Sequence, residues 1–150
     1  MSPTLPDSLA EVVDEFADTP AELRLEALLD YAGRVPPLPG GMDRGDLEAV
    51  PECQTPFFVA TELDDGGRVR LHFDAPREAP TTRGFAGILH TGLDGATPDQ
   101  VLAVPGDFYT RMGLAQVISP LRLRGMSAIL ARVKRQVRAR AGLPHPDPSA

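Results

Sequence analysis

One cysteine, Cys53, is the residue of this chain best suited to covalent chemistry. It lies in the segment 50–57, VPECQTPF, between Pro51 and Pro56 and directly ahead of an apolar, strand-like run. A cysteine used for packing would fit better inside that run, whereas a proline-bracketed loop predicts a thiol that is presented to another molecule. The thiolate is the reactive form, and at an ordinary pKa of about 8.5 only a few per cent of it exists at neutral pH. We expect the neighbouring Glu52 to lower that fraction, so activation has to come from a cation, a backbone dipole or a partner.

Other groups with catalytic potential are sparse. Zinc and iron–sulfur sites require several closely spaced Cys or His ligands, and this chain has one cysteine and the scattered His72, His90 and His145. Gly40-Gly41 lies in a proline-rich stretch rather than between a strand and a helix, so no phosphate-binding loop is predicted. We expect His72 on the solvated face of a strand and His90 near a helix end. The sequence therefore predicts no acid–base pair, no metal site and no cofactor.

The composition is that of one soluble domain. A chain of 150 residues with 42% hydrophobic and 24% charged residues is long enough to bury a core without disulfide bonds. Residues 1–16 lack the basic start and apolar centre of a secretory signal, and no run approaches the roughly 20 apolar residues that span a bilayer, so a cytoplasmic protein without membrane contact is expected. The net charge of −6 disfavours a nucleic-acid partner. The solvated face of a C-terminal helix is expected to hold Arg132, Lys134, Arg135 and Arg138.

Two amphipathic helices are predicted ahead of the cysteine. Ser8 with Glu11 gives a capping-box pattern, as does Thr19 with Glu22, so the helices should begin near Ser8 and near Pro20. Apolar residues recur at helical spacing behind each box. The predicted buried stripes are Leu9, Val12, Val13 and Phe16 in the first helix, and Leu25, Leu28, Leu29 and Ala32 in the second, which Gly33 can end.

A β-hairpin is predicted after the cysteine. Residues 56–63 and 68–74 are strand-like, and the Asp-Asp-Gly-Gly sequence at 64–67 is a strong turn signal. A short strand at 47–50 would add a third member to the sheet. Alternation of apolar and polar residues predicts a core face, covered by the second helix, that carries Val69, Leu71 and Phe73.

Several helices are predicted to follow the hairpin. Their expected N-terminal caps are Thr81 or Thr82, Thr97, Asp107 and Ser119. The buried stripe of the last and longest helix is expected to be Met126, Ile129, Leu130, Val133 and Val137. The pattern predicts a single two-layer α+β domain over residues 1–141, with two N-terminal helices, a three-stranded antiparallel sheet and C-terminal helices. Residues 142–150 are predicted to form a flexible tail.

Two motifs resemble those of a known family, the SufE-like sulfur acceptors. Residues 50–55, VPECQT, are similar to the family's Gly-Cys-Gln-Ser acceptor motif, and residues 112–125, MGLAQVISPLRLRG, to its Leu-Ser/Thr-Pro-Ser-Arg-x-x-Gly run. The exit from the second helix at 33–36, GRVP, and Glu78 before the third helix also align, so the resemblance runs over about 16–140. The departures from the family pattern are Glu52 for glycine, Thr55 for serine, Phe58 for tryptophan and Leu121 for serine.

The resemblance implies a sulfur carrier. Members of this family take persulfide sulfur from a cysteine desulfurase and pass it on for iron–sulfur cluster assembly, which makes Cys53 the expected acceptor. Gln54 is expected to shape the loop, Arg122 to anchor the loop or dock the partner, and Glu78 to support the site. Pyridoxal phosphate would belong to the desulfurase, and the recipient would be an iron–sulfur scaffold. Scaffold proteins share this architecture but hold clusters on several cysteines, so a scaffold role is not predicted for this chain.

The residues alone leave two alternatives open. Most free cysteines behave as small buried hydrophobes, so the chain could be a non-catalytic binding module in which Cys53 is structural. Arg122 could likewise be an ordinary surface arginine in the first turn of the last helix.

Overall fold

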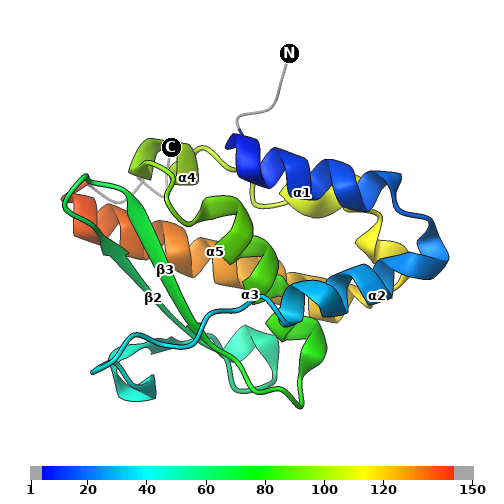
Figure 1. The fold of residues 1–150 in the computed structure, drawn as a ribbon, viewed down its shortest axis with the longest axis horizontal. Coiled ribbons are helices and arrows are strands. Elements are labelled where there is room, and N and C mark those ends of the chain that lie inside the picture. The colour runs from blue at the N-terminus through cyan, green and yellow to red at the C-terminus, as the bar shows by residue number, and fades with distance from the viewer. Residues whose placement is uncertain (1–4, 144–150) are drawn as a thin grey trace, which may run out of the picture.

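The computed structural model describes residues 5–143. Figure 1 shows the N-terminal helices, a small sheet and a long C-terminal helix around one core. The helices are α1 (Asp7–Asp18), α2 (Ala21–Ala32), α3 (Pro80–Leu93), α4 (Pro98–Leu102) and α5 (Pro120–Ala141), and the strands are β1 (Glu48–Ala49), β2 (Phe58–Leu63) and β3 (Val69–Asp74). Short 3-10 helices are η1 (Arg44–Asp46), η2 (Pro51–Cys53), η3 (Phe108–Met112) and η4 (Leu114–Gln116). The predicted α+β order of helices, antiparallel sheet and further helices is confirmed.

The two N-terminal helices begin without side-chain caps. The apolar stripe of α1 is buried as predicted, but the helix starts at Asp7 behind Pro6, so the capping box at Ser8 is wrong. The second box is also wrong, because Thr19 Oγ1 donates back to the Glu15 carbonyl oxygen at 2.6 Å and Pro20 takes the cap position of α2. Pro6 and Pro20 stand at the N-cap positions, and a proline side chain has no oxygen to accept from the N–H groups of the first turn, so both helices begin without a side-chain cap.

The buried face of α2 is rotated from the predicted one. Its buried residues are Leu28, Tyr31 and Ala32. Leu25 and Leu29 are 44% and 42% exposed, so the predicted stripe is wrong at these two positions. The close approach of α3 sets the face: a Cβ on Gly87 would lie 1.9 Å from the Tyr31 carbonyl oxygen, and one on Gly84 would lie 2.7 Å from the Leu28 carbonyl oxygen. Two glycines on α3 thus let the backbones of the two helices meet, which a count of apolar spacing does not foresee.

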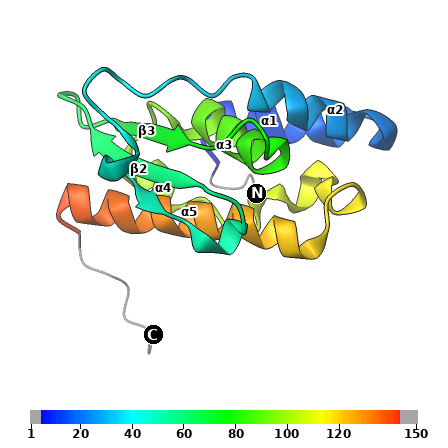
Figure 2. The same ribbon diagram turned by 90° about the horizontal axis from the view of Figure 1, so that it is seen from below.

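The sheet has the order β1-β2-β3, with both pairs antiparallel. Val59 lies opposite Phe73 and Thr61 opposite Leu71, and the core face of β3 is the predicted one. The helix that runs along β2 is α5 (Figure 2), whereas α2 packs on α3. The expectation that the second helix covers the hairpin is therefore wrong. With 22 residues and a fully buried stripe, α5 offers the sheet a longer apolar face than the 12-residue α2.

Two of the predicted caps after the hairpin are present. Thr97 Oγ1 and Ser119 Oγ each accept a hydrogen bond from the backbone N–H three residues later, at 3.2 and 3.3 Å. Asp107 precedes η3 without a side-chain cap bond, and α3 begins at Pro80, so the caps predicted at Asp107 and at Thr81 or Thr82 are wrong.

The last helix, α5, ends at Gly142, which has the left-handed φ of 71° typical of a helix C-terminus. The predicted tail begins here, but residues 144–150 lie outside the described residues. Within the described part of the chain, no helix combines the length and the apolar character that crossing a membrane requires.

Candidate functional site

Cys53 lies in a tight turn between β1 and β2. Val50 follows the two-residue β1, and its N–H donates to the Phe57 carbonyl oxygen at 2.8 Å, which closes the loop. Inside the loop, Cys53 N–H donates to the Val50 carbonyl oxygen at 3.1 Å. Gln54 then has φ 62°, the one positive φ at a non-glycine position among the described residues. This left-handed backbone reverses the chain and leads it from η2 toward β2.

The thiol faces α5 rather than solvent. Cys53 is 8% exposed, and its Sγ lies 4.0 Å from the Gly125 carbonyl oxygen. A Cβ on Gly125 would lie 3.4 Å from Sγ, an ordinary contact distance, so the thiol packs directly beside this residue of α5. The prediction that the proline-bracketed loop presents the thiol to another molecule is therefore wrong for this conformation. Pro51, Glu52 and Gln54 around it are exposed, but the sulfur, which is weakly polar, is buried against the helix.

This environment keeps the thiol protonated. Burial and, second, the negative charge of Glu52 raise the pKa of Cys53 to about 12, while Arg132 acts in the opposite direction. At pH 7 the thiolate is then roughly one part in 10⁵. Activation of Cys53 as a nucleophile therefore requires a change in its surroundings.

Arg132 of α5 binds both ends of the β1–η2 segment. Its Nη1 donates to Glu48 Oε2 at 2.7 Å and to the Ala49 carbonyl oxygen at 3.2 Å. Its Nη2 donates to the two carboxylate oxygens of Glu52 at 3.1 and 3.2 Å. From the sequence, Arg132 was expected on a solvated face. The signal that could have identified it is Glu52, because an acidic residue where the family has glycine calls for a cationic partner.

Other basic residues of α5 also make specific contacts. Arg135 pairs with Glu48, and this hydrogen bond is the main reason why the pKa of Glu48 is lowered to about 2. Lys134 donates to the Val104 carbonyl oxygen, and burial lowers the pKa of its ammonium group. The interpretation as a purely solvated face is thus wrong for Arg132, Lys134 and Arg135.

The other residues singled out from the sequence lie apart from the thiol. The Arg122 side chain is exposed in the first turn of α5, and Glu78 is exposed in the connection from β3 to α3. Among the described residues, neither side chain makes a hydrogen bond or ion pair with the Cys53 turn. Thr55 does fix this region, because its Oγ1 lies 3.2 Å from Thr82 Oγ1 at the start of α3.

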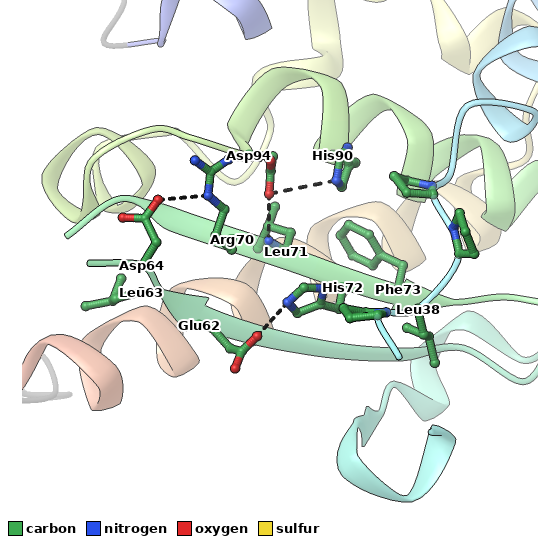
Figure 3. A pocket seen from close by; sticks show the side chains of 13 residues that line it. Leu38, Glu62, Leu63, Asp64, Arg70, Leu71, His72, Phe73, His90 and Asp94 are labelled. Atoms are coloured by element: carbon green, nitrogen blue, oxygen red, sulfur yellow. Dashed lines mark hydrogen bonds and ion pairs between the residues drawn. The ribbon is translucent and has the colours of Figure 1, made fainter. Parts of the chain in front are cut away.

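A groove of about 440 Å³ lies on another side of the molecule, between the hairpin, the end of α3 and the segment 36–39 (Figure 3). His72 Nε2 lies 2.7 Å from Glu62 Oε1 in this groove. With its side chain only 17% exposed, His72 is not the solvated residue that was expected. His90 stands near the end of α3 as predicted, 3.8 Å from Asp94, and burial lowers the pKa of its imidazole.

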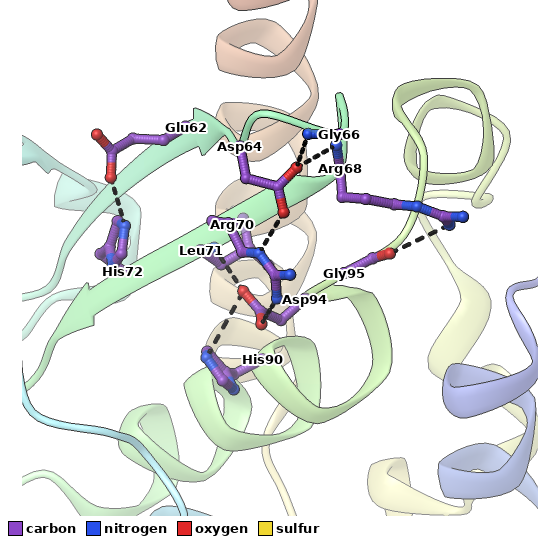
Figure 4. A network of polar contacts seen from close by, with 10 residues as sticks. All are labelled: Glu62, Asp64, Gly66, Arg68, Arg70, Leu71, His72, His90, Asp94 and Gly95. Atoms are coloured by element: carbon purple, nitrogen blue, oxygen red, sulfur yellow. Dashed lines mark hydrogen bonds and ion pairs between the residues drawn. The ribbon is translucent and has the colours of Figure 1, made fainter.

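The charged groups beside this groove satisfy one another (Figure 4). Arg70 donates to Asp64 at 2.9 Å and to Asp94 at 3.0 Å, and Asp94 Oδ1 accepts from Leu71 N–H at 2.9 Å on the outer edge of β3. Within the described residues, no group of three or more Cys, His, Asp or Glu side chains could hold a metal ion. This network therefore stabilises the hairpin edge.

The fold is a small α+β domain in which the single cysteine lies on a turn packed against a helix. The chain belongs to the SufE family: the family model described as SufE, Fe-S metabolism associated domain, matches residues 10–137. The resemblance seen in the sequence is thereby confirmed, and it connects the chain with iron–sulfur metabolism.

Individual proteins are also similar to this chain over most of its length. An uncharacterized SufE-like protein of Mycobacterium tuberculosis is 56% identical over 135 residues, which cover 90% of this chain and 94% of that protein. The solution structure of a hypothetical protein from Thermus thermophilus has a TM-score of 0.83 and 48% identity, covering 92% of this chain and 98% of that one. A chloroplastic quinolinate synthase of Oryza sativa subsp. japonica is 32% identical over 143 residues, which are 93% of this chain and 20% of that enzyme.

Proposed function

We propose that this chain accepts sulfur from a cysteine desulfurase on Cys53 and passes it on for iron–sulfur cluster assembly. The observation that carries the proposal is the place of the chain's one thiol on a short turn whose flanking strand has two residues, in a domain of the SufE family. Because β1 is only two residues long, few sheet hydrogen bonds hold the turn, and we infer that it can move away from α5.

The proposed step is a thiol exchange. The Cys53 thiolate attacks the outer sulfur of the persulfide on the desulfurase; the new Cys53 S–S bond forms as the donor's S–S bond breaks, and the donor cysteine leaves as a thiolate that takes up a proton. One thiol and one persulfide become one persulfide and one thiol, so no oxidant is consumed. The rate depends on ionisation of Cys53 and on access to the sulfur under attack. Since the pKa of Cys53 is about 12 in the closed turn, we place deprotonation after the turn has left α5.

The remaining roles follow from this step. Gln54 supplies the reversed backbone that orients the turn, the exposed Arg122 docks the desulfurase, and Glu78 borders the same end of α3 that contacts Thr55. Pyridoxal phosphate acts in the desulfurase, and an iron–sulfur scaffold receives the sulfur. A chain with a single cysteine suits the reducing cytoplasm, where we place the reaction.

Mass spectrometry tests the proposal directly. The parent protein and Cys53→Ser are incubated with the cognate desulfurase and free cysteine, and the intact mass is measured before and after reduction. We expect the parent to gain one sulfur atom that reduction removes, and Cys53→Ser to gain none. An active desulfurase that leaves the parent mass unchanged would contradict the proposal.

The burial of Cys53 favours one rival, a non-catalytic binding module in which this cysteine only fills space. In that case Cys53→Ser binds the desulfurase as the parent does, and neither protein changes desulfurase turnover. A parent protein that accelerates turnover while Cys53→Ser does not excludes this rival.

A further inference from the structure

Among the described side chains of α5, Arg132 hydrogen-bonds to Glu52 within the Cys53 turn, while Arg135 and Gln136 join it at Glu48, ahead of the turn. Arg132 contacts Glu48 and Ala49 before the turn and Glu52 within it, while the hydrogen bonds of Cys53 N–H and Gln54 N–H stay inside the turn and can move with it. The guanidinium is the larger part of the polar link, since the thiol itself offers α5 only a 4.0 Å contact with the Gly125 carbonyl oxygen.

The geometry of this link opposes exposure of the thiol. Both oxygens of Glu52 face Nη2 of Arg132, at 3.1 and 3.2 Å, so a rotation that swings Cys53 away from α5 pulls the adjacent carboxylate off the guanidinium. The Arg132 side chain is 24% exposed, and its hold on Glu48 at 2.7 Å keeps it in place when the turn moves.

We infer that Arg132 is a positioning residue which, through Glu52, sets how often the Cys53 turn opens and thereby the rate of sulfur acceptance. This role rests on the proposed function, and it is specific to a chain that carries Glu52 in the acceptor motif. Glu52 is 49% exposed, so a cationic side chain on a docking partner can reach it and replace Arg132 as the turn opens.

The two possible roles of Arg132 predict opposite changes in the reaction rate of Cys53 when Arg132 is replaced. If Arg132 acted on Cys53 only through its charge, removing it would raise the pKa of the thiol further and slow every reaction of the thiolate. If Arg132 holds the turn closed, removing it speeds those reactions, because a larger share of molecules has the thiol in solvent.

The experiment measures alkylation of Cys53 by iodoacetamide, a neutral reagent, at pH 7.5 in the folded protein. Since Cys53 is the chain's single cysteine, the adduct reports one site. We expect Arg132→Gln to react about two to five times faster than the parent, in line with the modest strength of exposed ion pairs. Arg132→Lys, which keeps the charge but loses the two-nitrogen fork, should fall between them. Arg135→Gln is the matched control, because Arg135 lies on the same helix as Arg132 and binds Glu48 but not Glu52. The alkylation rate of this variant should equal that of the parent.

Two further measurements test whether faster alkylation comes from global unfolding and whether Arg132 acts through Glu52. Urea unfolding midpoints identify any variant whose faster alkylation comes from global unfolding, and Arg132→Lys then serves as the less disruptive change. In a Glu52→Gln background, Arg132→Gln should bring no further acceleration, since the link is already broken.

A rate for Arg132→Gln equal to or below that of the parent, or a parent-like rate for Arg132→Lys, would overturn the inference. Sulfur uptake from the desulfurase, followed by mass spectrometry, is the second readout and should accelerate with alkylation. Faster alkylation without faster uptake would overturn the positioning role alone. A parent that takes up no sulfur at all would instead refute the proposed function, while the alkylation rates would still report on the turn.

Discussion

The cysteine turn and the groove beside the hairpin differ in the number of their ionisable groups and in how these groups are paired. The groove is the larger hollow and has two imidazoles and three carboxylates, yet these groups pair with one another or with Arg70. The turn has one buried thiol, which contacts the Gly125 carbonyl oxygen, and an ion pair between Glu52 and Arg132 of α5. The side with more ionisable groups is therefore the better neutralised one.

On the proposed function, this difference separates a stabilising network from a reactive site. In the groove, Asp94 satisfies the outer edge of β3 through Leu71 N–H, so its polar groups serve the hairpin. At the turn, a movement away from α5 would break the ion pair between Glu52 and Arg132 and change the charge state of Cys53. A protein that hands sulfur from one partner to another needs a thiol that can be exposed more than it needs a pocket for a small substrate.

The strongest test of the comparison removes chemistry from each region in turn. Cys53→Ala should abolish stimulation of desulfurase turnover, whereas the double variant His72→Gln/His90→Gln should stimulate as the parent does. The reason is that only Cys53 can form the persulfide, while the two imidazoles are engaged with Glu62 and Asp94. Turnover is measured as alanine release from cysteine. Loss of stimulation in the histidine variant, with its fold intact, would move the functional site to the groove.

A second test uses alkaline pH. The pKa of Cys53 in the folded chain, about 12, lies above that of the unfolded chain, so burial of the neutral thiol stabilises the fold fully below about pH 8.5 and this contribution is lost as pH rises toward 12. The difference in unfolding free energy between the parent and Cys53→Ala should therefore shrink from pH 8 to pH 11, by up to about 1.4 kcal/mol per pH unit. The pKa of Tyr31 is also raised to about 12, but it is present in both proteins and cancels. A difference that stays constant across this range would mean that the thiol is already exposed in solution.

The smallest expected effect comes from the groove. Asp94→Ala removes the acceptor of the Leu71 N–H and the ion-pair partner of Arg70 and His90. It should lower the unfolding free energy by about 1–2 kcal/mol. Asp65→Ala, at an exposed position of the hairpin turn, is the control and should change it by less than about 0.5 kcal/mol. Neither change should alter the alkylation rate of Cys53. Faster alkylation in Asp94→Ala at unchanged global stability would show that the two regions are coupled.

Sequence patterns predicted the fold well where the structure depends on residues close together in the chain. The Asp-Asp-Gly-Gly turn and the alternation of Val69, Leu71 and Phe73 predicted the hairpin and its core face, and the stripe of α5 is buried throughout. The buried face of α2 was predicted wrongly because it depends on contact with Gly84 and Gly87 of another helix. Whether a Ser or Thr caps a helix likewise depended on competition from a neighbouring proline, as at Pro6 and Pro20.

The candidate site was predictable only in part. Cys53 stood out because it is the single thiol and lies in a motif, but its burial comes from packing on α5, where it meets Gly125, 72 residues further along the chain. Arg132 could not be assigned from sequence for a similar reason, since its partners Glu48 and Glu52 meet it only when the sheet docks on α5. Long-range contacts of this kind decide the protonation of the thiol, and local patterns do not encode them.

The contact between Cys53 and Gly125 has a consequence for a loaded thiol. The outer sulfur of a persulfide lies about 2.05 Å beyond the first, whereas Cys53 Sγ already lies 4.0 Å from the Gly125 carbonyl oxygen in a side chain that is 8% exposed. On the proposed function, the second sulfur adds volume at a contact that is already close-packed, so the loaded turn packs on α5 differently from the empty one.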